Sequence, residues 1–185
     1  QEIEVEEMSF SSRVKEELSQ QLSSARHCQI AEIAAILSLC GRIHIDEEDH
    51  YSIRIHTENV AVARKYFTLL KKAFNIGTDI SIRRNAFLKK NRTYTVVIRG
   101  HEDSVRVLEA CKLLDEHGEV SENFPFEESG SPESVLPQGL YQSAFLAAGS
   151  LSDPEKFYHF EIVCASEEKA KQLQAMIATF QLMRK

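Results

Sequence analysis

Apolar and polar residues along the chain follow two periods, and the period changes near glycines. Apolar residues at helical spacing predict amphipathic helices over residues 11–22, 58–74, 102–114 and 166–180. Residues 29–40 and 140–149 are apolar nearly all round and rich in alanine, which indicates two buried helices ending at Gly41 and Gly149. Two-residue alternation predicts strands, which we list in chain order: 42–46, 51–56, 80–82, 94–98 and 158–163.

These elements repeat in order, which predicts an internal duplication of helix, hairpin and helix. Gly149, Tyr158 and Phe180 follow Gly41, Tyr51 and Phe74 by 108, 107 and 106 residues. We therefore expect residues 8–114 to form the first half and 138–185 a truncated second half, with an acidic linker at 115–137. Residues 1–7 are interpreted as an extension or artificial remnant before Met8, and the chain as part of a longer protein.

Charge is distributed unevenly along the chain, although the net charge is −6. Residues 1–7 carry four glutamates, so the rest of the chain has a charge of −6 + 4 = −2. Residues 80–101 hold six lysines or arginines and no acid, whereas 113–155 hold nine acids and no lysine or arginine. A chain segregated in this way can present a basic surface to a polyanion despite its acidic total.

The sequence gives little support for metal, nucleotide or acid–base chemistry. It has no G-x-S-x-G, P-loop or G-x-G-x-x-G motif, and its four cysteines are too scattered for a disulfide framework. Cys28 and Cys40 lie too far apart on one helix to bind the same metal ion. Cys40 also lies near His44, but we interpret Cys40 as a buried thiol rather than a zinc ligand. His159 and Glu161 are interpreted as an exposed hydrogen-bonded pair. We expect no cofactor or metal, and a cytoplasmic protein without a membrane partner.

Strand parity gathers basic residues on one face of the first predicted sheet. This face should carry Arg42, His44, Arg54, His56, Arg83 and Arg99, with Asp46 as the only acid. The loop of the second hairpin should add Arg84, Lys89, Lys90 and Arg92. A sheet with one exposed face carries polar residues whether or not it binds a ligand. The basic face could therefore contact nucleic acid, contact a protein partner, or only be exposed to solvent. Glu161 in the second half takes the place of Arg54 in the first.

The two alanine-rich helices also carry a family resemblance. IAAILSLCG (33–41) and YQSAFLAAG (141–149) resemble degenerate copies of the LAGLIDADG motif of homing endonucleases. The stretches MSFSSRVKEEL, LKKNRTYTVVIRG and LAAGSLSDPEKFYHFEIVCASEEKA resemble the WhiA family of bacterial transcription regulators, which are linked to sporulation and cell division. The resemblance implies an α+β fold with pseudo-duplicated helix–hairpin–helix units and antiparallel sheets, and a helix-turn-helix domain after Lys185. The chain departs from the family at SVLPQGLYQ, where relatives usually have Cys and Arg.

The resemblance also implies what the protein does. Active homing endonucleases hold metal ions with an acid at the eighth motif position, where this chain has Cys40 and Ala148. Asp46 and Asp153 lie past the motif glycines and are interpreted as solvated turn residues. We therefore expect no catalytic residue. We expect a non-catalytic module, located in the bacterial nucleoid, that binds duplex DNA weakly and largely without sequence preference. A transcription-machinery protein is a possible further binding partner. A scaffold without DNA contact and a residual metal-dependent endonuclease are the alternatives.

Overall fold

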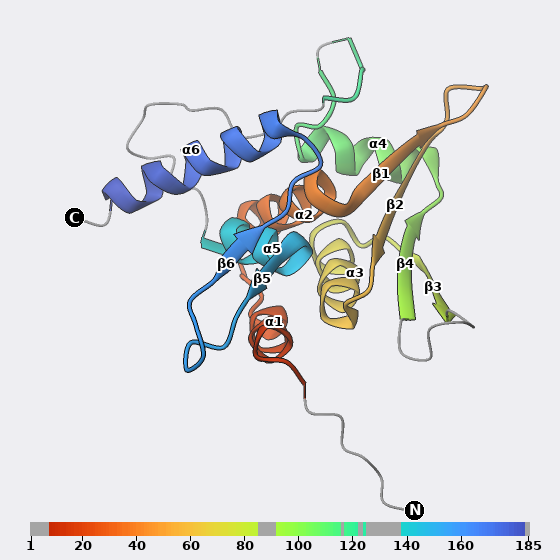
Figure 1. Ribbon diagram of the computed structural model, residues 1–185. Helices are drawn as coiled ribbons and strands as arrows, with labels where there is room; N and C mark the ends of the chain where they lie inside the picture. The colour runs from red at the N-terminus through yellow and green to blue at the C-terminus, as the bar shows by residue number, and fades with distance from the viewer. Residues whose placement is uncertain (1–7, 85–91, 116, 122–123, 125–137, 184–185) are drawn as a thin grey trace, which may run out of the picture.

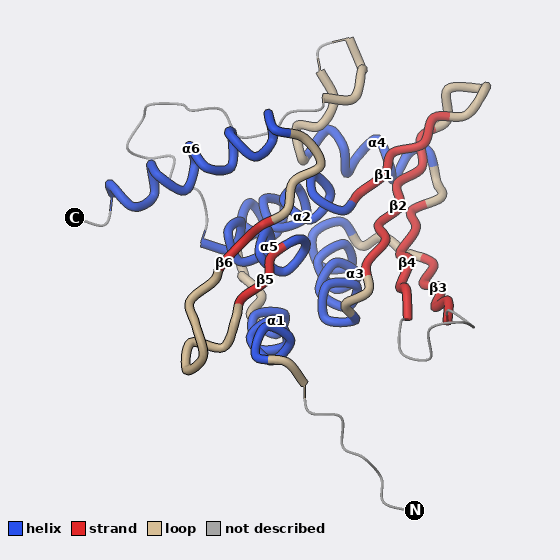
Figure 2. The backbone as a smooth tube through the Cα atoms, viewed as in Figure 1, coloured by secondary structure: helices blue, strands red, loops and turns tan. Residues whose placement is uncertain are grey.

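The computed structural model describes residues 8–84, 92–115, 117–121, 124 and 138–183, and it combines six helices with two antiparallel sheets in this part of the chain (Figures 1 and 2). The helices are α1 (Phe10–Gln20), α2 (Arg26–Cys40), α3 (Val60–Phe74), α4 (His101–Ala110), α5 (Gln138–Ala148) and α6 (Glu167–Met183). The strands are β1 (Gly41–Ile45), β2 (Tyr51–Thr57), β3 (Asp79–Arg84), β4 (Arg92–Ile98), β5 (Gly149–Leu151) and β6 (Phe160–Ile162). The first four strands form one sheet in the order β1-β2-β4-β3, and β5 and β6 form the other.

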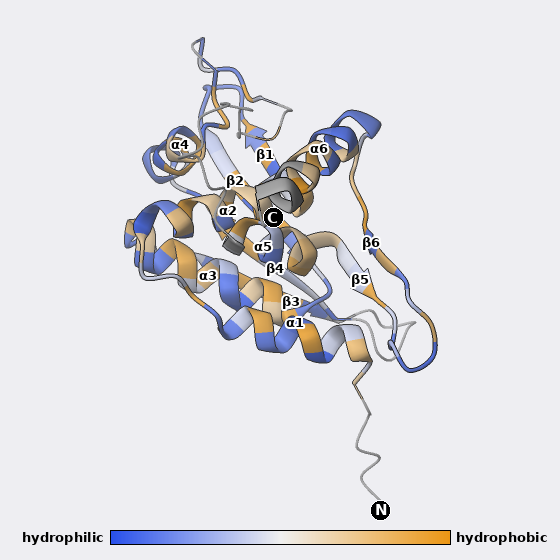
Figure 3. Cartoon of the chain, turned by 90° about the vertical axis from the view of Figure 1, so that its left-hand side faces the viewer, coloured by the Kyte–Doolittle hydropathy of each residue, from blue (hydrophilic) through white to orange (hydrophobic). Residues whose placement is uncertain are grey.

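Helices α2 and α5 pack against each other at the centre of the molecule, as the duplication predicts (Figures 1 and 3). Their seam uses small residues: Ala31 and Ala35 of α2 are buried in one cluster with Leu140 and Ala144 of α5. Small side chains let two helix backbones approach closely. The α+β architecture with two repeated helix–strand–strand–helix units is therefore confirmed.

Each central helix ends at a glycine from which a strand starts at once. Gly41 has extended backbone angles (φ −82°, ψ 156°), so a left-handed conformation is not what requires glycine here. A Cβ atom on Gly41 would collide with the backbone carbonyl of Leu37, and one on Gly149 would lie 2.6 Å from the carbonyl oxygen of Phe145 and collide with its ring. Glycine thus allows the abrupt change from helix to strand in both halves.

We expect Gly41→Ala to lower the free energy of unfolding by about 1–3 kcal/mol, because backbone atoms must shift to make room for the methyl group. Gly77→Ala is the matched control, since nothing lies within 4 Å of a Cβ atom at Gly77 and its φ is not positive. Urea denaturation followed by circular dichroism measures both variants. Equal stability of the two would contradict the steric explanation.

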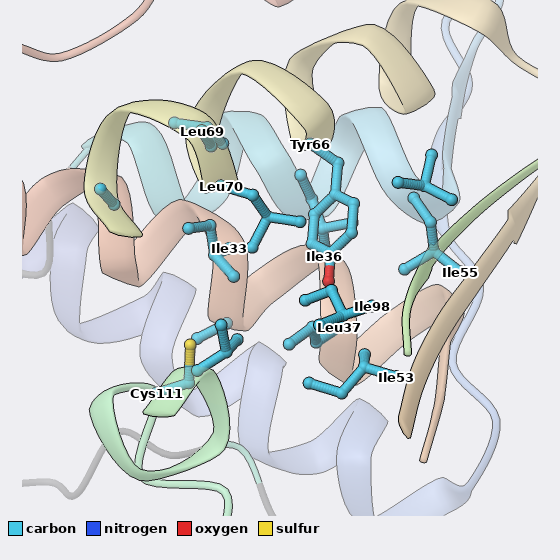
Figure 4. Close-up of a cluster of buried hydrophobic side chains, with 14 of the residues drawn as sticks. Ile33, Ile36, Leu37, Ile53, Ile55, Tyr66, Leu69, Leu70, Ile98 and Cys111 are labelled. Carbon is cyan, nitrogen blue, oxygen red and sulfur yellow. The ribbon is translucent and has the colours of Figure 1, made fainter. Parts of the chain in front are cut away.

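Helices α2, α3 and α4 cover one face of the four-stranded sheet, which we call the inner face. The core between them contains Ile33 and Leu37 of α2, Tyr66 and Leu70 of α3, and strand residues such as Ile53 (Figure 4). These side chains are no more than 5% exposed. On the sheet side, the core consists of the alternating isoleucines and valines of β2 and β4. The other face, which we call the outer face, carries the polar residues of the same strands.

A buried ion pair joins three helices beneath this core. Lys65 of α3 is fully buried, and its Nζ lies 2.9 Å from Oε2 of Glu32 on α2. The same ammonium donates to the carbonyl oxygens of Leu18 (3.3 Å) and Gln21 (2.9 Å) at the C-terminal end of α1, so all three of its N–H groups have acceptors. The sequence pattern does not reveal this pair, because an apolar stripe surrounds each residue and 33 positions separate them.

Several predicted boundaries move by a few residues. Helix α1 begins at Phe10 and ends at Gln20 instead of spanning 11–22, and its cap is Ser9, whose side chain accepts from the backbone N–H of Ser12. Helix α4 ends at Ala110 instead of continuing to residue 114. Strand β6 spans Phe160–Ile162, so the predicted strand at 158–163 was too long, and Tyr158 lies outside it at 90% exposure. Most of the predicted linker at 115–137 falls outside the described residues.

Candidate nucleic-acid interface

The strand register gathers arginines on the outer face. Arg42 of β1 lies directly opposite Arg54 of β2, and Arg54 lies opposite Val97 of β4. Arg83 lies opposite Thr93 on the far side of β4. Directly opposed residues have Cβ atoms about 4.5–5.5 Å apart, so Arg42 and Arg54 hold like charges close together. Neither of them, nor Arg83, forms an ion pair within the described part of the chain.

His56 lies between these arginines. It pairs with Thr95 across β2 and β4, and its Nδ1 shares a 3.0 Å hydrogen bond with the Thr95 hydroxyl. Partial burial lowers the pKa of His56, and the positive charges of Arg54, Arg42 and Arg83 lower it further. The strand register thus places three guanidinium groups on the same face as His56.

Arg99 has a different environment from the other outer-face arginines. Its Nε lies 2.6 Å from Oδ2 of Asp79, the first residue of β3, and both side chains are exposed. Asp79 lies at the same register level as Val97, which puts it on the outer face. The prediction that Asp46 is the only acid of this face was therefore wrong, because β3 starts one residue earlier than the alternation indicates. Arg99 is consequently neutralised.

The structure also corrects part of the predicted basic loop. Arg84 and Arg92 are strand residues that pair with each other at the ends of β3 and β4. The register position of Arg92 belongs with Tyr94, on the inner face, so Arg92 does not extend the outer-face arginines. Lys89 and Lys90 lie outside the described residues. His44 pairs with Ser52 and is exposed on the outer face, as predicted.

The ends of the two central helices offer no carboxylate for a metal ion. The Cys40 thiol donates to the carbonyl oxygen of Ile36 at 3.3 Å, and burial raises its pKa to about 12, which keeps it protonated. Ala148 has no functional group. Asp46 accepts the backbone N–H groups of Glu48 and His50 at 2.9 Å each, and Asp153 accepts that of Glu155 at 3.0 Å, so both acids are turn residues. No group of three potential metal ligands occurs within the described ranges.

The second sheet carries the opposite charge at equivalent positions. Ser150 lies opposite Glu161 across β5 and β6, as Arg42 lies opposite Arg54 in the first sheet. Glu161 accepts a hydrogen bond from Ser150 (2.9 Å) and contacts His159 Nε2 at 3.2 Å, and these bonds lower the pKa of its carboxyl group. The exposed His159–Glu161 pair is confirmed, and the two halves differ in charge where they share a fold.

Comparison with known proteins assigns the family. The family model described as the WhiA N-terminal LAGLIDADG-like domain matches residues 26–114, and the WhiA LAGLIDADG-like domain matches residues 137–185. The chain belongs to the WhiA family. Among WhiA relatives, the "Probable cell division protein WhiA" of Lachnoclostridium phytofermentans is 43% identical over 173 residues, covering 94% of this chain and 55% of the relative. The protein with the same description from Clostridium beijerinckii is 39% identical over 177 residues, with 95% and 56% coverage.

Solved WhiA structures share the fold. The chain matches full-length DUF199/WhiA from Thermatoga maritima with a TM-score of 0.64 at 19% identity, covering 94% of this chain and 51% of that one. It matches an N-terminal LAGLIDADG domain of DUF199/WhiA with a TM-score of 0.66 at 20% identity, covering 94% and 75%. This chain therefore spans about half the length of the curated WhiA relatives. No helix in its described part is long and apolar enough to cross a bilayer.

Proposed function

We propose that this chain is a non-catalytic, DNA-binding module of a WhiA-type transcription regulator in the bacterial nucleoid, with a role in cell division. The proposal rests on the outer face of the first sheet, where Arg42, Arg54 and Arg83 lie on the same face as His56 and form no ion pair with a residue that the structure describes. The role in cell division follows from the descriptions of its relatives. Within this proposal, residues 8–114 and 138–185 are the two halves, and 115–137 is the acidic linker.

Arginines spread over a sheet suit contact with the phosphates of duplex DNA. The planar guanidinium group presents five donors and keeps its charge at every physiological pH. Phosphate contacts position a protein on DNA without selecting a sequence, so the choice of operator rests with another part of the regulator. The acidic counterpart in the second sheet, Glu161, repels phosphates. DNA therefore contacts the molecule asymmetrically, through the first half.

Salt dependence of binding tests the proposal. Arg99 is paired with Asp79 and Arg92 lies on the other face, so we expect about three to five phosphate contacts. Each contact contributes about 0.9 to the slope, so a plot of the logarithm of the binding constant against the logarithm of the salt concentration should have a slope of roughly −3 to −4.5. The net charge of −6 opposes binding, so the affinity for random duplex DNA at physiological salt should be micromolar or weaker. Fluorescence anisotropy with a labelled 20-base-pair duplex measures both. Failure to bind at 20 mM salt would refute the proposal.

We also expect no metal-dependent cleavage of DNA, because neither Cys40 nor Ala148 can hold a divalent cation that prefers oxygen ligands. Supercoiled plasmid incubated with the protein and Mg²⁺ or Mn²⁺ should stay intact. The control is Asp46→Asn together with Asp153→Asn. Nicking that follows the protein through purification and disappears in this variant would show that the turn acids have taken over a catalytic role.

One observation favours a second candidate function, a protein-interaction scaffold. Phe157, Tyr158, Phe160 and Val163 are large apolar residues of the second half, and each is at least 58% exposed. Neighbouring exposed apolar residues are typical of surfaces that contact other proteins. Strand β6 and the loop before it lie apart from the first sheet (Figure 1), so a transcription-machinery protein could bind there while the outer face holds DNA. If DNA binding fails the salt test, this surface becomes the leading candidate.

A further inference from the structure

Three arginines share the outer face with His56, and of these four residues only the histidine can change its charge near neutral pH. His56 occupies β2 two residues after Arg54, and successive same-face residues on a strand are about 6.5–7 Å apart. Arg42 lies on the neighbouring strand β1, opposite Arg54, and Arg83 lies on β3, opposite Thr93 of the intervening strand β4. A phosphate bound among the three guanidinium groups would therefore lie beside the imidazole ring.

The charges that surround His56 explain its behaviour in the free protein. The charged or titratable groups of the outer face that face it from the four strands are Arg42 and His44 on β1, Arg54 on β2, Asp79 and Arg83 on β3, and Arg99 after β4. Asp79 and Arg99 neutralise each other, so the remaining field is positive. Partial desolvation and this positive field lower the pKa of His56 from its ordinary value, which favours the neutral ring.

We propose that His56 takes up a proton when a phosphate of duplex DNA binds between Arg42, Arg54 and Arg83, so that the imidazolium becomes a further cation of the interface. The phosphate offsets the arginine charges that disfavour the protonated ring, and it favours the protonated form directly. The hydroxyl of Thr95 can both donate and accept, so the His56–Thr95 hydrogen bond survives protonation. The proton comes from solvent, and DNA binding therefore tightens as pH falls.

This inference rests on the proposed function, and the sign of its pH dependence follows from linkage. A group whose pKa is higher in the complex than in the free protein makes the complex more stable at low pH. The advantage is full below the pKa of the free protein and is lost as pH rises through the pKa of the complex. A pKa difference of one unit corresponds to about a tenfold change in affinity. We expect an increase of about five- to tenfold between pH 7.5 and pH 5.5 from His56.

The experiment measures binding of the whole chain to a labelled duplex at pH 7.5 and 5.5, each over a range of salt. At pH 5.5 the wild-type slope should be steeper by about 0.9, because one more cation contacts phosphate. His56→Gln should lose both the steeper slope and most of the gain in affinity that the wild type shows between pH 7.5 and pH 5.5. His27→Gln is the matched control, because His27 is an exposed histidine of α2 and not of the sheet, and this variant should keep both.

Direct titration of the His56 ring by NMR gives a second readout that does not depend on a variant. Its pKa should lie below the usual value in the free protein and should rise when the duplex is added. Binding that shows the same pH dependence in wild type and His56→Gln, or an unmoved His56 pKa in the complex, would overturn this inference and leave the proposed function standing. Absence of DNA binding at either pH would refute both.

Discussion

Replacing Lys65 with methionine should lower the free energy of unfolding by about 3–5 kcal/mol, the range measured when one partner of a buried ion pair is removed. Methionine fills much of the space of the lysine stem, so the loss comes from charge rather than volume. Glu32 would remain 2% exposed without its cation, and among the described residues it would keep the long 3.5 Å contact from Ser143. The carbonyl oxygens of Leu18 and Gln21 would lose a donor as well. Urea denaturation followed by circular dichroism measures the change.

Two further variants separate charge from packing. Arg64→Ala removes the neighbouring exposed ion pair with Glu16, whose atoms are 2.7 Å apart, and should cost at most about 1 kcal/mol. Combining Glu32→Gln with Lys65→Met removes both charges and should recover part of the lost stability, because no unpaired buried charge is left. A double variant no more stable than Lys65→Met alone would show that the lysine acts mainly through its packing and its bonds to α1.

Replacing Arg54 and Arg83 with alanine should weaken binding to duplex DNA by about 50-fold at 0.1 M salt. Each lost phosphate contact removes about 0.9 from the salt slope, so the slope should flatten by about two units. Both side chains lie on the outer face, so the fold should be retained, which circular dichroism checks. Anisotropy titrations at several salt concentrations give the two quantities.

The matched control removes two charges elsewhere. Lys71 and Lys72 lie in the last turn of α3, which packs against the inner face, and both are exposed. Lys71→Ala with Lys72→Ala changes the net charge by the same amount and should leave the slope within about half a unit of wild type. Equal losses in the two double variants would mean that the total charge, and not the outer face, governs binding.

Much of this fold follows from patterns of residues close in sequence. The alanine-rich stretches around Ala35 and Ala144 indicate helices buried on all sides, and the repeat at one offset indicates that they pack together. Alternation places Ile53 and Ile55 inward and Arg54 outward without reference to any other strand. These inferences depend on local periodicity, which the final structure keeps because burial of the apolar residues is what stabilises each element.

Features that depend on distant partners could not be predicted in the same way. Glu32 and Lys65 are compatible with buried helices only because they meet each other and the end of α1. Asp79 lies on the outer face because pairing with β4 starts β3 at this residue, one position before the alternating apolar residues begin. The sequence pattern predicts Arg84 and Arg92 as loop residues, whereas pairing between strands makes them the ends of β3 and β4. Strand ends are set by pairing, and a single sequence does not carry that information.

The location of bound DNA is the central claim, and chemical-shift mapping tests it most directly. The ¹⁵N-labelled chain is titrated with a 12-base-pair duplex at low salt, and amide shifts are followed residue by residue. We predict that the largest changes occur on the first sheet, at Arg42, Arg54, His56 and Arg83, and that Ser150 and Glu161 of the second sheet change little. Changes centred on the second sheet or on α6, with the first sheet unmoved, would contradict the account.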